Sequence, residues 1–358
     1  MLIFSLRQYS RPDERRHEAI SHLIHTLLHF FANCLHRIRK GNIMAQYHVY
    51  GIGNALVDKE FEVSDAFFAE NGIEKGQMTL LDQAQQESLL TKLMDQFGLK
   101  NRAGGGSAAN TIFAAQYLGA KTFYSCNVAN DETGDFFIKD LTSAGIDTNL
   151  GDDREDGTTG KCMVMITPDA ERTMNTYLGI TADLNHEHIT PDALHQSEYA
   201  YIEGYLVTND GARDAAIKCK RLAEEKGVKT AMTFSDPAMV QFFKDGITEM
   251  LDGGVDLLFC NEQEAKLYAG VESLEDAKQA ISKLAKTYAI TRGAKGALVF
   301  DGQQEHIIEP FAAKAVDSNG AGDNFAGAFL YGITNGLDFA QAGKLASRIS
   351  SQVVSQLA

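Results

Sequence analysis

Residues 316–329 read Val-Asp-Ser-Asn-Gly-Ala-Gly-Asp-Asn-Phe-Ala-Gly-Ala-Phe. An apolar strand ends at Val316, glycines form a turn, and the small and aromatic residues after it predict an apolar helix. Gly320, Ala321 and Gly322 have almost no side chain, so their N–H groups can approach an anion closely. The helix dipole adds partial positive charge at the same point. This stretch therefore predicts a strand, an anion-binding turn and a helix, which is a local unit of an α/β fold.

Asp323 lies in the first turn of that helix, beside the predicted anion hole. A carboxylate in this place can take the proton of an attacking hydroxyl. A transferring phosphoryl group carries spread negative charge, and preorganised donors are the main device for stabilising it. A bare Gly-x-Gly-Asp would be an ordinary helix start with a charge. The whole run favours a phosphoryl-transfer centre at residues 317–323, with Asp323 as the base.

The rest of the chain after Met44 alternates short β-rich runs with helical patterns, which predicts an α/β fold with a mostly parallel sheet. Strands are predicted at 49–53, 228–234, 255–260, 289–291 and 297–300. Helices are predicted at 107–118, 212–226, from 262, and at 274–288, 320–331 and 339–357. Residues 59–81 and 158–177 look like β-hairpin material and are expected to form a small β lid. Residues 44–58, 82–157 and 178–358 are expected to form a three-layer α/β/α core.

The first 43 residues differ from the remainder. They carry a net charge of +4, which leaves −19 for residues 44–358, and they contain half of the ten histidines. One interpretation is a targeting or metal-binding tail. The interpretation we favour is upstream sequence translated from an early start codon, with Met44 as the true beginning. At the other end, Gln356-Leu357-Ala358 falls within a predicted helix, so a truncated C-terminus is also expected.

Composition limits the partners. The formal charge of −15 argues against a nucleic-acid or anionic-membrane surface, which needs clustered Lys and Arg. The five cysteines include no Cys-x-x-Cys pair, which is typical of a reduced intracellular protein, and a cytoplasmic location is expected. No apolar run is long enough to span a bilayer. The expected partners are small molecules, and a monomer or a homodimer remains open.

A glycine-rich stretch and a single carboxylate are further candidates for binding the acceptor. Residues 104–110 read Gly-Gly-Gly-Ser-Ala-Ala-Asn, a glycine turn that enters a helix, with Ser107 as a natural N-cap. Asp58 follows the first strand, at the edge where open α/β sheets bind ligands, and it can accept two hydrogen bonds from a vicinal diol. The alternative for residues 104–110 is a purely structural turn. The alternative for Asp58 is an exposed carboxylate in a surface turn.

These motifs together resemble the ribokinase-like (PfkB) carbohydrate and nucleoside kinases, from about residue 47 to the C-terminus. The family signature Asp-Thr-x-Gly-Ala-Gly-Asp matches residues 317–323, with Ser318 in place of Thr. Asn319 and the Gly-Gly-Ser form of the second motif are similar to the adenosine kinase branch. The resemblance implies that Asp323 is the base and that residues 320–323 form the anion hole. It also implies an acceptor site formed by Asn54, Asp58, Gly105, Gly106, Ser107 and Asn110.

The resemblance also marks a nucleotide side. Asn261 and Glu264 fit the family pattern Asn-x-x-Glu, which organises Mg²⁺ and phosphates largely through water. Thr291, Gly293 and Gly296 fit its nucleotide loop, although a hairpin turn is the alternative. No Gly-x-x-x-x-Gly-Lys-Ser/Thr loop is present. The expected cofactor is Mg²⁺ with ATP as co-substrate, with a monovalent cation as a further possibility.

The resemblance implies an ATP-dependent kinase that acts on the 5′-hydroxyl of a purine nucleoside, with adenosine preferred. A sugar kinase for ribose, fructose or a sugar acid is the alternative within the family, and a nucleoside-binding protein without catalysis is a third. Arg172, in the predicted lid, is a candidate for contact with substrate or phosphate, or else an exposed arginine. Met78, Met163 and Met165 are candidates for contact with the base, or else core residues.

Overall fold

The computed structural model describes residues 45–169, 171–313 and 320–355. The predictions for residues 1–43, for Asp317, Ser318 and Asn319, and for residues 356–358 therefore lie outside the described residues. No helix within the described ranges has the length and apolar content needed to cross a membrane.

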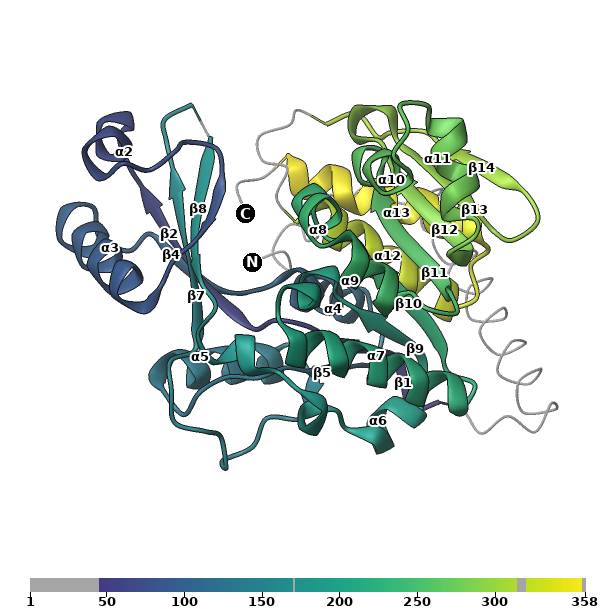
Figure 1. The fold of residues 1–358 in the computed structure, drawn as a ribbon, viewed down its shortest axis with the longest axis horizontal. Helices are drawn as coiled ribbons and strands as arrows, with labels where there is room; N and C mark the ends of the chain where they lie inside the picture. The colour runs from purple at the N-terminus through teal and green to yellow at the C-terminus, as the bar shows by residue number, and fades with distance from the viewer. Residues whose placement is uncertain (1–44, 170, 314–319, 356–358) are drawn as a thin grey trace, which may run out of the picture. The chain divides into compact units, whose positions relative to one another are not determined.

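A nine-stranded sheet forms the centre of the larger part of the fold, in the order β14-β13-β12-β11-β10-β9-β1-β5-β6 (Figure 1). The strands are β1 (Tyr47–Ile52), β5 (Thr122–Ser125), β6 (Asp147–Thr148), β9 (Ser197–Ile202), β10 (Lys229–Thr233), β11 (Val255–Asn261), β12 (Ala285–Thr291), β13 (Ala297–Phe300) and β14 (Glu305–Ile308). From β12 to β6 the neighbours run parallel, whereas β13 and β14 are antiparallel. Val49 and Ile52 on β1 are fully buried, as expected for a central strand covered on both faces.

Helices cover both faces of this sheet, which gives the predicted three layers. On one face α4 (Ser107–Tyr117), α12 (Ala321–Thr334) and α13 (Phe339–Val354) pack together. The other face carries α6 (Pro191–His195), α7 (Asp210–Glu225), α8 (Pro237–Phe242), α9 (Lys244–Met250), α10 (Glu262–Ala269) and α11 (Leu274–Ile281). Helix α5 (Glu132–Ser143) packs beside β6, and the short 3₁₀ turns are η2 (Gly179–Asp183), η3 (His186–His188), η4 (Gly204–Thr208) and η5 (Gly293–Lys295).

A second, five-stranded sheet has the order β3-β8-β7-β2-β4. Its strands are β2 (Leu56–Glu62), β3 (Met78–Leu80), β4 (Asn101–Gly105), β7 (Gly160–Ile166) and β8 (Arg172–Tyr177). Helices α2 (Asp65–Asn71) and α3 (Gln83–Gln96) cover one face of it (Figure 1). That face has its own apolar cluster, which includes Phe61, Phe67, Leu93, Met163 and Met165. The alternate residues Cys162 and Val164 belong to the opposite face, because side chains alternate along a strand.

The small sheet differs from the predicted lid in two ways. Residues 158–177 form the expected hairpin, since β7 and β8 pair antiparallel. The stretch 59–81 is not hairpin material throughout, because it contains α2, whose Phe67 and Phe68 are buried against the sheet. Strand β4 also belongs to the small sheet and α3 covers it, whereas the sequence predicts that residues 82–157 belong to the core. Strand β4 pairs with β2, so the chain adds three strands to the small sheet before it first returns to the large one, and β7 and β8 complete the small sheet later.

One predicted helix is also wrong in its extent. The helix expected at 274–288 ends at Ile281, and strand β12 already begins at Ala285. The residues from Ala285 pair with β11, starting with Ala285 opposite Val255. Tertiary pairing therefore decides the structure of a stretch whose apolar residues also fit a helical period.

Candidate active site

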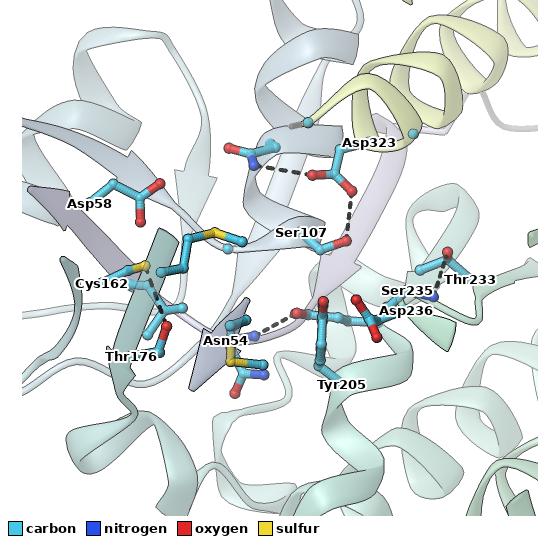
Figure 2. Close-up of a pocket in the computed structure, with 18 of the residues that line it drawn as sticks. Asn54, Asp58, Ser107, Cys162, Thr176, Tyr205, Thr233, Ser235, Asp236 and Asp323 are labelled. Carbon is cyan, nitrogen blue, oxygen red and sulfur yellow. Dashed lines mark hydrogen bonds between the residues drawn. The ribbon is translucent and has the colours of Figure 1, made fainter. Parts of the chain in front are cut away.

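One pocket of about 560 Å³ lies where strands of the large sheet end and the small sheet faces them. Figure 2 shows its two walls, with Asp58 and Cys162 of the small sheet on one side and Asp323 and Ser107 on the other. The carboxyl ends of parallel strands are where open α/β folds bind ligands. The structure therefore brings the two predicted carboxylates, which are far apart in the sequence, to one cavity.

Asp323 lies in the first turn of α12 and is held by two side chains of α4. The Ser107 hydroxyl donates to its Oδ1 at 2.7 Å, and the Asn110 amide donates to its Oδ2 at 3.1 Å. The helix pair meets closely because Gly327 has no side chain, and a Cβ there would lie 2.3 Å from the Thr111 carbonyl oxygen on α4. Gly106, rather than Ser107, is the N-cap of α4, which leaves the Ser107 hydroxyl to orient Asp323.

Desolvation in the pocket raises the pKa of Asp323 from 3.8 to about 6, while the hydrogen bonds from Ser107 and Asn110 oppose the rise. A carboxyl group with this pKa is largely ionised at neutral pH, and it can still accept a proton from a hydroxyl group that is being deprotonated. Ser107 and Asn110 were predicted to contact the acceptor. In the structure they line the pocket and also hold the carboxylate.

The residues of the predicted anion hole lie at the start of α12. Gly320 is its N-cap with φ 67°, a left-handed conformation that favours glycine. Nothing lies within 4 Å of a Cβ built at Gly322, so that side of the turn is open. Gly320 and Gly322 line the pocket, whereas Ala321 contributes backbone, its carbonyl oxygen accepting a hydrogen bond from the Ser350 hydroxyl. The first amides of a helix have no partner within it, so they can bind an anion.

Asp58 lies on β2, opposite Ala103 of β4 and Cys162 of β7. A Cβ at Gly105 would lie 2.5 Å from Asp58 Oδ1, so Gly105 makes room for the carboxylate rather than lining the pocket itself. Desolvation first, and then the neighbouring Glu60 carboxylate, raise the pKa of Asp58 to about 7, against the effect of Arg172. At neutral pH both protonation states of Asp58 are thus populated.

Asn54 and Gly106 lie where the chain first leaves the large sheet, after β1, and where it first returns to it, after β4. Asn54 is buried, and its carbonyl oxygen accepts a hydrogen bond from the Tyr124 hydroxyl at 2.7 Å. Gly106 has φ 107°, and a Cβ there would lie 2.5 Å from the Asn54 carbonyl oxygen. Both residues line the pocket, as predicted for the acceptor side. The glycine is needed both for its conformation and for the close approach.

The predicted nucleotide residues fall into two groups. Asn261, Glu264 and Thr291 line the same pocket. Gly293 and Gly296 lie beyond it, in the turn between β12 and β13, so the hairpin interpretation describes their place. A Cβ at Gly296 would lie 2.0 Å from a carbonyl oxygen of β14, which gives this glycine a packing role.

Asn261 and Glu264 form a reciprocal cap at the start of α10. The Asn261 backbone N–H donates to one Glu264 oxygen at 2.8 Å, and its side-chain amide donates to the other at 2.7 Å. Glu264 is only 4% exposed. Desolvation first, with the Asp236 and Asp323 carboxylates adding to it, raises the pKa of Glu264 to about 7. The pair is therefore a structural cap whose carboxylate also borders the pocket.

Several pocket residues were missed or misjudged from the sequence. Glu203 and Tyr205 follow β9, and Ser235 and Asp236 follow β10. The only sequence signal for these residues is their position just past the carboxyl end of a strand. Asp58 is predicted from the same kind of position. Ser235 also has φ 69°, a positive value found at no other described residue except glycines.

The small sheet's contribution differs from the prediction too. Met78 lines the pocket, but Met163 and Met165 point to the opposite face, into the cluster under α2 and α3. Cys162, Val164 and Met174 take their place on the pocket wall. Arg172 also lines the pocket, with its guanidinium 3.3 Å from Glu60, so it is not an exposed hairpin arginine.

Comparisons with known proteins support the predicted family and fold. The model of the pfkB family of carbohydrate kinases matches residues 81–358. An adenosine kinase from Saccharomyces cerevisiae is 27% identical over 306 residues, which cover 80% of this chain and 88% of that protein.

Two solved structures are similar over nearly the whole fold. The adenosine kinase from Sinorhizobium meliloti superposes with a TM-score of 0.80 at 34% identity, covering 87% of this chain and 95% of its own. A probable sugar kinase from Rhizobium etli CFN 42 also has a TM-score of 0.80, at 33% identity, covering 88% of this chain and 94% of its own. The predicted ribokinase-like fold is therefore confirmed. The chain belongs to the pfkB family of carbohydrate kinases, close to the adenosine kinases, and is a phosphotransferase that acts on an alcohol group.

Proposed function

We propose that this kinase transfers the γ-phosphoryl group of ATP to the 5′-hydroxyl of a purine nucleoside, with adenosine as the preferred acceptor. The observation that carries the proposal is one pocket that holds a base, a second carboxylate suited to a diol, and an apolar wall. The similarity to adenosine kinases from two organisms supports the choice of nucleoside.

Asp323 is the proposed base. Its carboxylate is fixed by Ser107 and Asn110 and lies at the start of α12. A hydroxyl placed beside it would pass its proton to Asp323 as its oxygen attacks the phosphoryl group. The amides of residues 320–323 would stabilise the charge on the transferring group without moving. Positioning and electrostatic stabilisation are what phosphoryl transfer requires of a protein.

The acceptor would lie between Asp58 and Asp323. The Asp58 carboxyl group can accept hydrogen bonds from the two ribose hydroxyls, which leaves the 5′-hydroxyl directed to Asp323. Beyond Asp58 the wall is apolar, formed by Cys162, Val164 and Met174. A purine has flat apolar faces that such a wall can cover, whereas a free sugar would leave hydroxyl groups unpaired against it.

Mg²⁺ is the proposed companion of ATP, and the residues present fit it through water. Both Glu264 oxygens already accept hydrogen bonds from Asn261, and Mg²⁺ usually keeps several of its waters. The described residues include no group of three or more acidic, histidine or cysteine side chains arranged to hold a metal directly. When bound, the ion would neutralise charge on the phosphates. Asn261, Glu264 and Thr291 are the proposed contacts on the ATP side.

A coupled assay of ADP release over adenosine, inosine, guanosine, ribose and fructose tests the acceptor. Adenosine should give the highest kcat/KM. Asp323→Asn should lower kcat by about 100-fold or more, in line with the 10²–10⁴-fold that a positioned base contributes. Near wild-type turnover by Asp323→Asn would exclude it as the base. Turnover of none of these acceptors by a folded protein that binds adenosine would favour a nucleoside-binding role instead.

A sugar kinase is the second candidate, because the Rhizobium etli relative of similar identity is a probable sugar kinase. The same panel separates the two. A higher kcat/KM for ribose or fructose than for adenosine would replace the nucleoside proposal and leave the role of Asp323 intact.

A further inference from the structure

Glu203 is a buried carboxyl group that the mechanism above does not use. It follows β9, is 1% exposed, and lies on the wall of the pocket. Its Oε2 accepts a hydrogen bond from the Asn54 backbone N–H at 2.6 Å. The Asn54 side chain and the Ala108 backbone N–H also hydrogen bond to this carboxyl group. A buried carboxyl group with several donors converging on it needs an explanation beyond packing.

These partners lie at the two points where the chain first leaves the large sheet and then returns. Asn54 lies between β1 and β2, and Ala108 lies in the first turn of α4, directly after β4. One side chain therefore contacts these two connections at once, although β6 to β7 and β8 to β9 connect the sheets as well. Ala108 is adjacent to Ser107, whose hydroxyl holds Asp323. The Glu203 contact is thus one residue away from the hydrogen bond that orients the proposed base.

The surroundings leave no room for a looser arrangement. A Cβ at Gly53 would lie 2.0 Å from Glu203 Oε2 and 2.6 Å from the Ala108 side chain. Glycine at position 53 is what allows the carboxyl group to enter between the two connections. On the other side, the Gly204 backbone N–H donates to the Ser235 hydroxyl at 2.9 Å, which fixes the turn that carries Glu203. Ser235 itself lies after β10 and has the positive φ, so the neighbouring turn that anchors Gly204 is in a conformation unusual for a residue with a side chain.

We propose that Glu203 is a positioning residue whose carboxyl group fastens the Asn54 and Ala108 connections, so that the acceptor residues on both keep their places relative to Asp323. The proposal rests on the assignment of Asp323 as the base. It does not depend on which alcohol is the acceptor.

The electrostatic surroundings of Glu203 favour the neutral, protonated form of its carboxyl group. Desolvation is the largest cause that raises the pKa of Glu203, from 4.5 to about 8, and the Asp323 charge adds to it against the hydrogen bonds from Asn54 and Ala108. The titratable groups placed against Glu203 are all neutral or negative at pH 7: Asp323 on α12, Tyr124 on β5, Cys126 just after β5, Tyr201 on β9 and Tyr205 on η4. A second negative charge here would oppose the approach of phosphates and weaken the anion hole.

Two substitutions test this role. Glu203→Gln keeps a neutral side chain of the same shape whose oxygen can accept the same N–H groups. It should retain kcat within about threefold at pH 7, and it should lack the fall in kcat above pH 8 that is expected of the wild type. Glu203→Ala leaves those donors without their acceptor and should lower kcat by about 100-fold, as misplacement of reacting groups by about 1 Å does. Glu225→Gln, on the exposed end of α7, is the matched control and should change neither value.

A stability measurement provides the second readout and needs no substrate. Because the folded-state pKa of Glu203 is raised, its contribution to stability is complete below pH 4.5 and is lost as pH rises towards 8. The fall in Tm between pH 6 and pH 9 should therefore be smaller in Glu203→Gln than in the wild type. This readout remains valid if Glu203→Ala fails to fold or if Asp323 proves not to be the base.

Each contrary result overturns the proposal. Loss of kcat in Glu203→Gln at pH 7 as large as in Glu203→Ala would mean that the ionised group is required. A selective rise in the acceptor KM with kcat unchanged would make Glu203 a substrate contact. Full activity in Glu203→Ala would exclude the positioning role. The same fall of Tm with pH in the wild type and in Glu203→Gln would exclude the neutral form of Glu203.

Discussion

The hydrogen bond from Ser107 to Asp323 predicts a measurable shift in the pH dependence of catalysis. Ser107→Ala removes a 2.7 Å hydrogen bond to a carboxylate whose pKa desolvation has raised to about 6. A hydrogen bond to a charged group contributes about 1.5–3 kcal/mol, and the lower end applies where water can replace the donor. Since one pKa unit corresponds to about 1.4 kcal/mol, the pKa of Asp323 should rise to roughly 7.

The direction of the effect follows from the proposed role of Asp323 as a base. Only the ionised carboxylate accepts a proton, so activity falls as pH drops through its pKa. At pH 6 the ionised fraction should decrease from about one half to about one tenth, which lowers kcat about fivefold in Ser107→Ala. At pH 9 Asp323 is fully ionised in both proteins, and their kcat values should differ little.

The assay is kcat from ADP release between pH 5.5 and 9, at saturating ATP and acceptor. Saturation matters because Ser107 also lines the pocket on the proposed acceptor side, so its loss should raise KM independently. Ser143→Ala, at the exposed end of α5, is the control and should leave the profile unchanged. An acidic limb in Ser107→Ala at the same pH as in the wild type would refute the reasoning, because the limb would then belong to another group.

Asp58→Ala should raise the acceptor KM by about 10–100-fold, from one or two lost hydrogen bonds to a charged group, while the KM for ATP changes little in the same assay. Gly327→Ala should lower the free energy of unfolding by about 1–3 kcal/mol, because its Cβ meets backbone of α4, whereas Gly211→Ala, where the contact is ordinary, should not; urea unfolding measures both. Met163→Ala should destabilise by about 2–5 kcal/mol in the same experiment with unchanged KM, and Val164→Thr should raise the nucleoside KM with less effect on stability. An increase in nucleoside KM with Met163→Ala alone would contradict the assignment of the two faces.

The sequence was sufficient for the parts of the site that depend on backbone conformation. Gly320 begins a helix in a left-handed conformation and Gly106 combines a positive φ with a close approach, so both positions favour glycine and their pattern predicted the turns that border the pocket. Asp323 could be located because it follows such a pattern directly. The same local logic predicted the layers of the fold, since strands and helices alternate with a clear change of period.

Residues that depend on tertiary contacts could not be located in this way. Glu203 and Asp236 are single acidic residues at strand ends, and no local pattern distinguishes them from exposed turn residues. Helix α2 is only seven residues long, and its helical form depends on burying Phe67 and Phe68 against the small sheet. Ser107 was assigned to the acceptor alone because its bond to Asp323 joins positions 216 residues apart.

The apolar cluster under α2 and α3 gives the small sheet a separate source of stability, and this has a consequence for how the enzyme family diversifies. Along β7, alternate residues serve different ends: Met163 and Met165 maintain the cluster, while Cys162 and Val164 face the cavity. Selection can therefore replace the cavity-facing residues one at a time without weakening the element that carries them. Because side chains alternate along the strand, mutations that change the preferred acceptor need not destabilise the fold. The same scaffold can therefore evolve to bind different alcohols while helix α12 stays unchanged.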